Sequence, residues 1–285
     1  MKLYRNRWAI RTMARVLKVS ASGYYAWCKQ GVQSSPRAVL DTLVHSCYME
    51  LKQKSGYRPV FGLLRSRGYS YGHNRVQRSM QRQRLQAKLK RRFAKTTDSN
   101  HDLPIYENVL KRDFSALVPN KKWVGDITYV HTLKGWVYLA KYLDLCTRKV
   151  VGWAMSENID SELACKALRE ALIRENFPIG VIIHTDRGST YCSNAYRKLV
   201  DNYQCTGSMS RKGNCWDNAV AERFFSTLKR ELYEIDDYGN LKEAYDSLFE
   251  YIEGWYNPKR LHSAIRYKSP LTYERELLQS LKLTV

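Results

Sequence analysis

Hydrophobic and polar positions follow two different periods along this chain. In roughly the first ninety residues, apolar residues recur every three or four positions, as in amphipathic helices. The pattern predicts helices over residues 8–17, 20–27, 36–54, 58–67 and from Asn74 to about Arg92. Ser20 is a candidate N-cap and Gly68 a candidate stop, because their residue types suit these positions. The first two helices have a helix-turn-helix outline.

Beyond residue 120 the pattern changes to strand-like runs. Apolar, β-branched and aromatic runs predict strands over 123–130, 136–145, 150–155, 181–185 and 206–209. Helical periodicity predicts helices over 161–175, 194–202, 217–232 and 241–255. Three strands with short connections, followed by alternating helix and strand, indicate a mixed sheet flanked by helices on both faces. The predicted fold class is therefore α/β, with the element order of a ribonuclease-H-like fold, preceded by small all-α helix-turn-helix units.

Charge is concentrated at the front of the chain. Residues 1–122 carry 26 Lys and Arg against 6 Asp and Glu, net +20, and the remainder carries 22 against 21, net +1, which together give the total of +21. This polarity indicates a front end that binds nucleic acid, because phosphate neutralisation supplies most non-specific DNA affinity. In its last helix Arg75, Arg78 and Arg82 are candidate DNA contacts. The alternative is a solvated basic face.

Cysteine usage and hydropathy exclude several classes of protein. The seven cysteines are odd in number, scattered and never in a Cys-x-x-Cys pair, so neither a disulfide framework nor a zinc ribbon is indicated. No apolar run approaches the length of a membrane span, and the basic start lacks the apolar core of a signal peptide. We therefore expect a cytoplasmic protein with no membrane partner.

Three carboxylates form the candidate chemical site. Asp126 lies within a strand-like run, Asp186 ends the run 181–185, and 35 residues separate Asp186 from Glu222 in a predicted helix. If they converge, they can hold Mg²⁺ or Mn²⁺, which prefer charged oxygen ligands. In so basic a chain the substrate would be a polyphosphate. The plainer interpretations are a turn for Asp186 and a solvated helix position for Glu222, whereas Asp126 is costly to bury unless it is paired or metal-bound.

Further polar residues accompany these acids. Glu222 and Lys229 are seven residues apart, so they share one helix edge, where the lysine could hold a DNA phosphate. Asp217 is expected to cap the start of the same helix. Near the end of the chain, Arg260 and His262 either contact DNA or form a solvated basic turn.

Short motifs along the chain carry a family resemblance. They lie at 22–27, 56–58, 120–129, 144–153, 184–191, 212–222, 229–231 and 256–263, and include Trp123-Val-Gly-Asp126 and His184-Thr-Asp186-Arg-Gly188. Together with the acid spacing, they are highly specific. Over nearly its whole length the chain resembles the second-reading-frame, catalytic protein of bacterial insertion-sequence transposases of the IS-three family, whose core is similar to retroviral integrases.

The resemblance implies both a reaction and its catalytic groups. Asp126, Asp186 and Glu222 would be the catalytic triad and the ligands of Mg²⁺ or Mn²⁺, with two ions bound. The reaction would be metal-dependent cleavage and strand transfer at insertion-sequence ends, which frees a 3′-hydroxyl and joins it to another DNA strand. Two alternatives are a DNA-binding regulator of transposition without its own catalysis and a simple nuclease of the same fold.

The resemblance also implies partners and a division of the chain. The partners would be double-stranded DNA, as terminal inverted repeats and target, further copies of the chain in a synaptic complex, and the first-frame protein, joined by frameshifting. The protein would act at the bacterial nucleoid. We expect a helix-turn-helix-like unit at 1–35, a basic helical DNA-binding unit at 36–95, a linker at 96–120, an integrase-type catalytic core at 121–235 and a C-terminal helical extension at 236–285.

Overall fold

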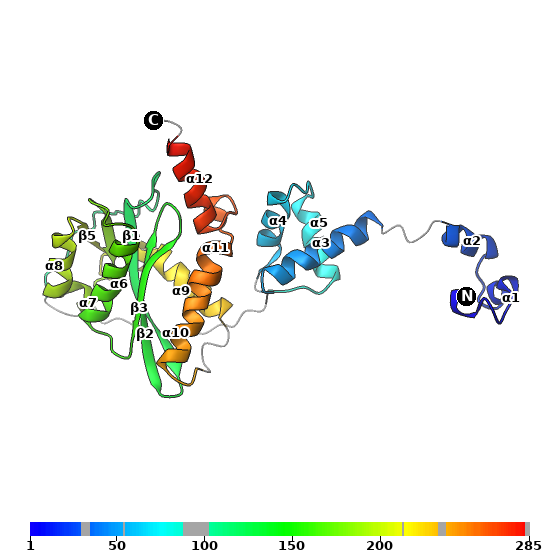
Figure 1. Ribbon diagram of the computed structural model, residues 1–285, viewed down its shortest axis with the longest axis horizontal. Helices are drawn as coiled ribbons and strands as arrows, with labels where there is room; N and C mark the ends of the chain where they lie inside the picture. The colour runs from blue at the N-terminus through cyan, green and yellow to red at the C-terminus, as the bar shows by residue number, and fades with distance from the viewer. Residues whose placement is uncertain (30–34, 54, 88–102, 213, 233–237, 283–285) are drawn as a thin grey trace.

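The chain forms a helical front end and a core built on a sheet (Figure 1). The computed structural model describes residues 1–29, 35–53, 55–87, 103–212, 214–232 and 238–282. The front-end helices are α1 (Ile10–Val16), α2 (Ala21–Lys29), α3 (Pro36–Glu50), α4 (Tyr57–Ser66) and α5 (His73–Arg82). They lie where the hydrophobic pattern predicts helices. The last three pack on one another, whereas α1 and α2 stand apart from the other elements in Figure 1.

Helices α4 and α5 end in the same backbone motif, in which a residue takes the left-handed conformation. Gly68 (φ 83°) ends α4, as the sequence predicts. Arg84 (φ 54°) follows α5 and donates its N–H to the Gln81 carbonyl, while the N–H of Leu85 donates to the Met80 carbonyl. These two bonds satisfy carbonyls that the helix leaves open and turn the chain away. The predicted extension of this helix to about Arg92 was therefore wrong within the described residues, and 88–92 lie outside them.

The core sheet is mixed, as predicted. Its strands are β1 (Lys122–Thr132), β2 (Gly135–Asp144), β3 (Val150–Ser156), β4 (Ile182–Thr185) and β5 (Thr206–Met209), in the spatial order β3-β2-β1-β4-β5. The first three strands pair antiparallel, because short connections return the chain directly. Strands β4 and β5 follow helical crossovers and run parallel to β1. This is the arrangement of a ribonuclease-H-like fold.

Helices cover both faces of the sheet. Their bounds are α6 (Ser161–Arg174), α7 (Ser189–Cys192), α8 (Asn194–Asn202), α9 (Ala219–Glu231), α10 (Leu241–Phe249), α11 (Asn257–Lys259) and α12 (Pro270–Lys282). One buried cluster joins α6 and α8 to the sheet, and another joins α9 and α10 to its opposite face. The predicted helix over 241–255 is α10 continued by a π-helical turn (Glu250–Tyr256), whereas α12 was not predicted. Within the described residues, no helix has the length and apolarity needed to cross a membrane.

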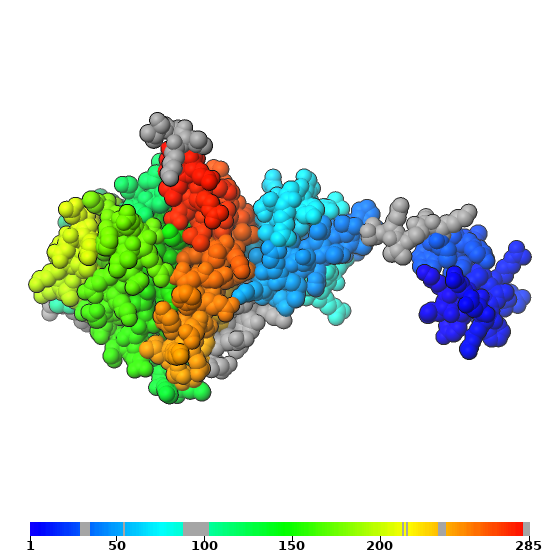
Figure 2. Space-filling model, viewed as in Figure 1, coloured from blue at the N-terminus to red at the C-terminus, as the bar shows by residue number. Residues whose placement is uncertain are grey.

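The front end is packed against the C-terminal part of the chain. Figure 2 shows α3 to α5 abutting the segment that follows α10. Lys52 pairs with Glu250 at 3.1 Å and lies 5.6 Å from the ring centroid of Trp255. Gly62 in α4 approaches the Tyr267 side chain so closely that a Cβ there would lie 2.8 Å from it. Apolar residues of both parts belong to one buried cluster, so the two parts share a core.

A buried histidine joins β4 to β5 and to the loop after it. The His184 ring is inaccessible to solvent. Its Nδ1 lies 2.8 Å from the Ser208 hydroxyl oxygen, and its Nε2 lies 3.1 Å from that of Ser210. Burial lowers the pKa of His184 from 6.5 to about 4, against an opposing effect of Asp217. The ring is therefore neutral in the folded chain at pH 7.

This burial predicts a loss of stability in acid. Between pH 6.5 and about 4 the unfolded chain protonates His184 and the folded chain does not, so stability falls as the pH decreases through this window. The contribution lost between pH 7 and pH 5 is about 2 kcal/mol. Urea denaturation at both pH values should therefore show a smaller drop for His184→Gln than for the unsubstituted chain. The control His45→Gln, at an exposed position of α3, should retain the full drop, and an equal drop in all three proteins would contradict the prediction.

Candidate active site

Asp126 and Asp186 are brought together by the parallel pairing of β1 with β4. Val124 and His184 are partners in this ladder. Asp126 lies two residues after Val124, and Asp186 lies two residues after His184. Asp126 is held by the N–H of Ile127, which donates to its Oδ1 at 2.9 Å. Asp186 follows the end of β4, and its Oδ1 accepts from the N–H of Gly188 at 3.0 Å. Burial, and next the charge of Asp186, raise the pKa of Asp126, so the two carboxylates interact.

Glu222 reaches the same place from the first turn of α9. This helix buries Phe224, Phe225 and Leu228 against the sheet, and these positions leave Glu222 on the adjacent edge. Burial raises the pKa of the Glu222 carboxyl, and the charge of Asp186 raises it further. The structure therefore brings the three predicted acids into one electrostatic neighbourhood.

The three acids do not form a closed cage. Within the part of the chain that the structure describes, no three His, Cys, Asp or Glu side chains are arranged to hold an ion as they stand. Like charges favour rotamers that spread them apart unless a cation lies between them. Side-chain rotation would therefore be part of binding a metal at this site.

Lys141 is a component of the site that the sequence reasoning missed. It faces Asp126 across the β1–β2 ladder and is inaccessible to solvent. Its Nζ lies 3.4 Å from the Val124 carbonyl oxygen and within 5.4 Å of the ring centroids of Phe224 and Phe225. Burial lowers the pKa of Lys141, and Asp126 opposes this effect. A lysine within an otherwise apolar strand was the signal that could have identified it.

Two further oxygens suit the site to a hard cation. The buried hydroxyl of Tyr191 has no hydrogen-bond partner among the described residues, and burial, followed by the charges of Asp126 and Asp186, raises its pKa. Asn218 precedes α9 and donates from Nδ2 to the Gly125 carbonyl at 3.4 Å, while its buried Oδ1 has no partner among the same residues. Carboxylate, hydroxyl and amide oxygens are the donors that Mg²⁺ and its bound waters accept. The residues present therefore fit a hydrated divalent cation.

Lys229 lies two turns along α9 from Glu222, as predicted from their spacing. Its ammonium nitrogen is 4.0 Å from the centroid of the Tyr129 ring in β1. The ring holds the cation by its negative face. Lys229 therefore lies beside Tyr129 of β1, three residues after Asp126.

The three arginines of α5 differ in their surroundings. Arg75 and Arg78 are exposed, and the guanidinium of Arg75 lies 5.3 Å from the centroid of Tyr71. Arg82 instead pairs with Asp41 of α3, which also accepts a hydrogen bond from the Ser79 hydroxyl at 2.5 Å. Arg75 and Arg78 can therefore face a ligand, whereas Arg82 ties α5 to α3.

Arg260 and His262 face the protein interior. The guanidinium of Arg260 donates to both carboxylate oxygens of Glu231 at 2.8–3.0 Å. The His262 ring packs on Tyr256, with centroids 4.9 Å apart, and burial lowers its pKa well below the usual value. These contacts are not those of a solvated basic turn, whereas contact of Arg260 and His262 with DNA stays a prediction. The interior contacts anchor the end of α9 to the C-terminal segment.

Asp217 does not cap α9, so that prediction was wrong. The N-cap position is Asn218, and no side chain there makes a capping bond. The Asp217 carboxylate is buried and accepts hydrogen bonds from Arg112 and Arg211 instead. Charge-assisted bonds from the two guanidinium groups, together with the backbone N–H of Arg211, hold this carboxylate away from the N–H groups of the α9 first turn.

The chain is similar to integrase cores and to insertion-sequence proteins. Two family models described as integrase core domains match residues 117–215 and 203–270. The chain is 41% identical over 274 residues to the transposase InsF for insertion sequence IS3A of Escherichia coli (strain K12), covering 95% of each chain. It is 40% identical over 271 residues to an uncharacterized 31 kDa protein of insertion element IS600 of Shigella sonnei, covering 94% of this chain and 99% of that protein.

Solved retroviral structures are more distant. The chain aligns with the simian T-cell lymphotropic virus intasome in complex with PP2A regulatory subunit B56 gamma at a TM-score of 0.47 and 16% identity, covering 80% of this chain and 73% of that one. The HTLV-2 integrase catalytic core domain in complex with magnesium aligns at a TM-score of 0.43 and 20% identity, covering 56% of this chain and 99% of that one.

Because the three carboxylates repel one another, removal of one negative charge should stabilise the folded chain when no metal is bound. In EDTA, Glu222→Gln should raise the urea midpoint slightly, because it removes repulsion with Asp186 that solvent partly screens at this exposed position. Asp126→Asn should lack this gain, since it also leaves the buried Lys141 without its counter-charge. Urea denaturation measures both effects.

Divalent cations should reverse the order of stability between Glu222→Gln and the unsubstituted chain. Added Mn²⁺ should stabilise the unsubstituted chain more than Glu222→Gln, because binding to the folded state adds to stability. Glu162→Gln, at an exposed acid of α6, is the control and should follow the unsubstituted chain. A Glu222→Gln protein that is less stable than the unsubstituted chain in EDTA would contradict the role of repulsion.

Proposed function

The chain belongs to the catalytic, second-reading-frame transposases of the IS-three family of bacterial insertion sequences, and from that premise we propose that Asp126, Asp186 and Glu222 catalyse its cleavage and joining of DNA. It is a DNA transposase with an integrase-type core. The observation that carries the assignment of residues is the electrostatic coupling of these three acids, which come from two parallel strands and one helix.

The metal requirement is part of the proposal. Asp126, Asp186 and Glu222 would hold Mg²⁺ or Mn²⁺, as two ions, with the oxygens of Tyr191 and Asn218 beside them. When bound, such ions lower the pKa of an attacking hydroxyl and stabilise the leaving oxygen of a phosphodiester. Support comes from the hard donor set and from the partnerless oxygens described above.

The proposed reaction has two steps at phosphorus, and two lysines of the chain would assist it. Water attacking the phosphorus at the element end forms one P–O bond and breaks another, which releases a 3′-hydroxyl. The same hydroxyl, attacking a second phosphodiester, joins the end to another strand without a covalent enzyme intermediate. Lys229 would hold a neighbouring phosphate by its charge, and Lys141 would balance the charge of Asp126 while the metal site is forming.

The substrate and partners follow from the same proposal. The front end would bind the terminal inverted repeats through Arg75 and Arg78, while the core at 121–235 acts on the ends and on target DNA. Two ends must be held together, so a homo-oligomeric synaptic complex is proposed, with the first-frame protein as a further partner at the nucleoid. The chain would divide into units at 1–35, 36–95 and 236–285 around this core, with 96–120 as the connection, of which residues 103–115 are fastened to the core. The relatives named above do not favour the regulator without catalysis.

Substitution of the acids tests the catalytic assignment. Asp126→Asn, Asp186→Asn and Glu222→Gln should each reduce cleavage and joining by about a thousandfold or more. The assay is product formation from a duplex carrying the element's own terminal repeat, with Mg²⁺ or Mn²⁺. Asp201→Asn, at an exposed acid of α8, is the control and should remain active. Full activity in Asp186→Asn would exclude the proposed triad, and nicks without joined products would favour a simple nuclease.

The front-end arginines predict a change in salt dependence. Arg75→Gln and Arg78→Gln should each lower the slope of log affinity against log salt by about 1, because each removes one phosphate contact. Affinity for the terminal repeat is measured by fluorescence anisotropy between 50 and 200 mM salt, concentrations chosen for the expected slope. Arg82→Gln is the matched control, since its guanidinium is paired with Asp41. Equal slopes in all these proteins would place the DNA on another surface.

A further inference from the structure

The segment that enters the core is fastened along β5. We call residues 103–115 the strap. The N–H groups of Val109 and Leu110 donate to the Ser208 hydroxyl at 3.0 and 3.1 Å, and the N–H of Met209 donates to the Glu107 carbonyl. The Tyr106 ring lies against Gly207, where a Cβ would come within 2.5 Å of it. The strap is therefore part of the core rather than a free connection.

The strap ends on the buried carboxylate of Asp217. This side chain is inaccessible to solvent and accepts five hydrogen bonds. Two come from the strap, from Asn108 Nδ2 at 3.0 Å and from Arg112 Nε at 2.7 Å. The other three come from the N–H, Nε and Nη2 of Arg211 at 2.9–3.0 Å. These donors hold the pKa of Asp217 well below its usual value, so it is ionised throughout the working pH range.

Asp217 lies at the junction between the two sides of the acid site. On one side, Arg187, the residue after Asp186, donates from Nε to the Ser210 carbonyl at 2.6 Å, next to Arg211. On the other side, α9 begins two residues after Asp217 and carries Glu222 in its first turn. One carboxylate therefore joins the strap, the loop after β5 and the start of α9.

The junction at Asp217 matters because the chain runs through the strap on its way from the front-end helices to the core. The strap is the part of the chain through which the front-end helices α3 to α5 reach the core. A displacement of the strap would act first on Asn108 and Arg112, and through Asp217 on the first turn of α9. Rigid secondary structure then carries the displacement to Glu222.

We propose that Arg112, with Asn108, is a positioning residue that sets the place of Glu222 relative to Asp186 and so couples the front end to the catalytic site. This inference rests on the proposed function of the three acids. A strap held on Asp217 fixes α9 in the orientation in which Glu222 faces Asp186. A released strap leaves Asp217 to Arg211 alone and lets the start of α9 move.

The test compares two arginines that fasten the strap at different points. Arg112→Ala removes the bond to Asp217, and Arg112→Lys keeps the charge. Arg197→Ala is the matched control, because Arg197 also holds the strap, at the Pro104 carbonyl and over the Tyr106 ring, without touching Asp217. The Arg112 side chain is 43% exposed and Arg211 remains on Asp217, so the fold should survive the change.

The expected result is a change in kcat rather than in DNA binding. Arg112→Ala should lower kcat on the terminal-repeat duplex about ten- to a hundredfold, since small misplacements of a reacting group cost this much. Its KM and its urea midpoint should stay unchanged, and Arg112→Lys should recover part of the loss. In calorimetric titrations without DNA, Arg112→Ala should need a several-fold higher Mn²⁺ concentration than the unsubstituted chain to reach half-saturation. Hydrogen exchange should rise in residues 219–225 of Arg112→Ala and stay unchanged in Arg197→Ala.

The outcomes separate this inference from the proposed function. If Glu222→Gln abolishes activity and Arg112→Ala behaves like Arg197→Ala, the positioning role is refuted and the catalytic assignment stands. If Glu222→Gln keeps its activity, the assignment of the acids fails first. Arg112→Ala that loses DNA affinity with unchanged kcat would make Arg112 a DNA contact instead, which also refutes the proposal.

Discussion

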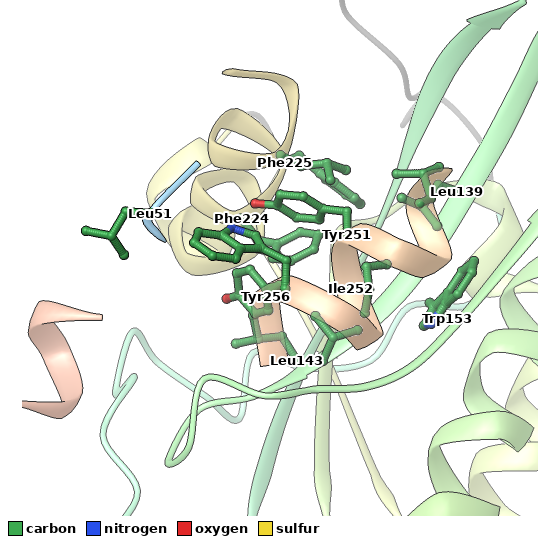
Figure 3. Close-up of a cluster of buried hydrophobic side chains, with 14 of the residues drawn as sticks. Leu51, Leu139, Leu143, Trp153, Phe224, Phe225, Tyr251, Ile252 and Tyr256 are labelled. Atoms are coloured by element: carbon green, nitrogen blue, oxygen red, sulfur yellow. The ribbon is translucent and has the colours of Figure 1, made fainter. Parts of the chain in front are cut away.

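The parallel pairing of β4 with β1 is the interaction on which the acid site depends. Its ladder sets Val124 beside His184, and this register carries Asp126 and Asp186 to neighbouring points. The two carboxylates repel each other, but neither strand can slide away without losing its backbone hydrogen bonds. Apolar packing positions the third acid, because the burial of Phe224 and Phe225 in the cluster of Figure 3 holds α9 on the sheet. Glu222 lies in the first turn of that helix.

The charge balance of the site is local and does not follow from the net charge of the chain. Residues 1–122 contain nearly all of the excess positive charge, yet the cation nearest Asp126 in the β1–β2 register is Lys141 of the near-neutral core. A buried lysine between two phenylalanine rings loses hydration, and it recovers part of that cost from the carboxylate opposite. Such a pair keeps a strand with a central acid foldable before a metal is bound. It also leaves Asp126 able to exchange one positive partner for another.

What the sequence could predict depended on whether a periodicity or a characteristic spacing marked the interacting residues. Periodicity located the strands and α9, and the spacing of Asp186 and Glu222 identified a pair that the structure brings together. Ion pairs that neither a periodicity nor a spacing marks left no pattern to follow. The pairing of Arg260 with Glu231 and that of Arg112 with Asp217 are set by the tertiary fold, so the sequence suggested only a basic turn or DNA contact at Arg260 and a capping aspartate at Asp217. Even the end of α5 required a left-handed arginine where the usual signal is glycine.

Two physical connections lead from the front-end helices α3 to α5 to α9, and they meet it at opposite ends. The covalent one runs through the strap to Asp217, just before the first turn. The other runs through the shared core, from Lys52 to Glu250 and Trp255, and then through Tyr251 and Arg260 to Glu231 in the last turn. Both ends of α9 are therefore held by segments that connect to the front end, the strap at its start and the C-terminal segment at its last turn. Under the coupling proposed above, a movement of α3 to α5 would reach α9 at both of its ends and so displace Glu222.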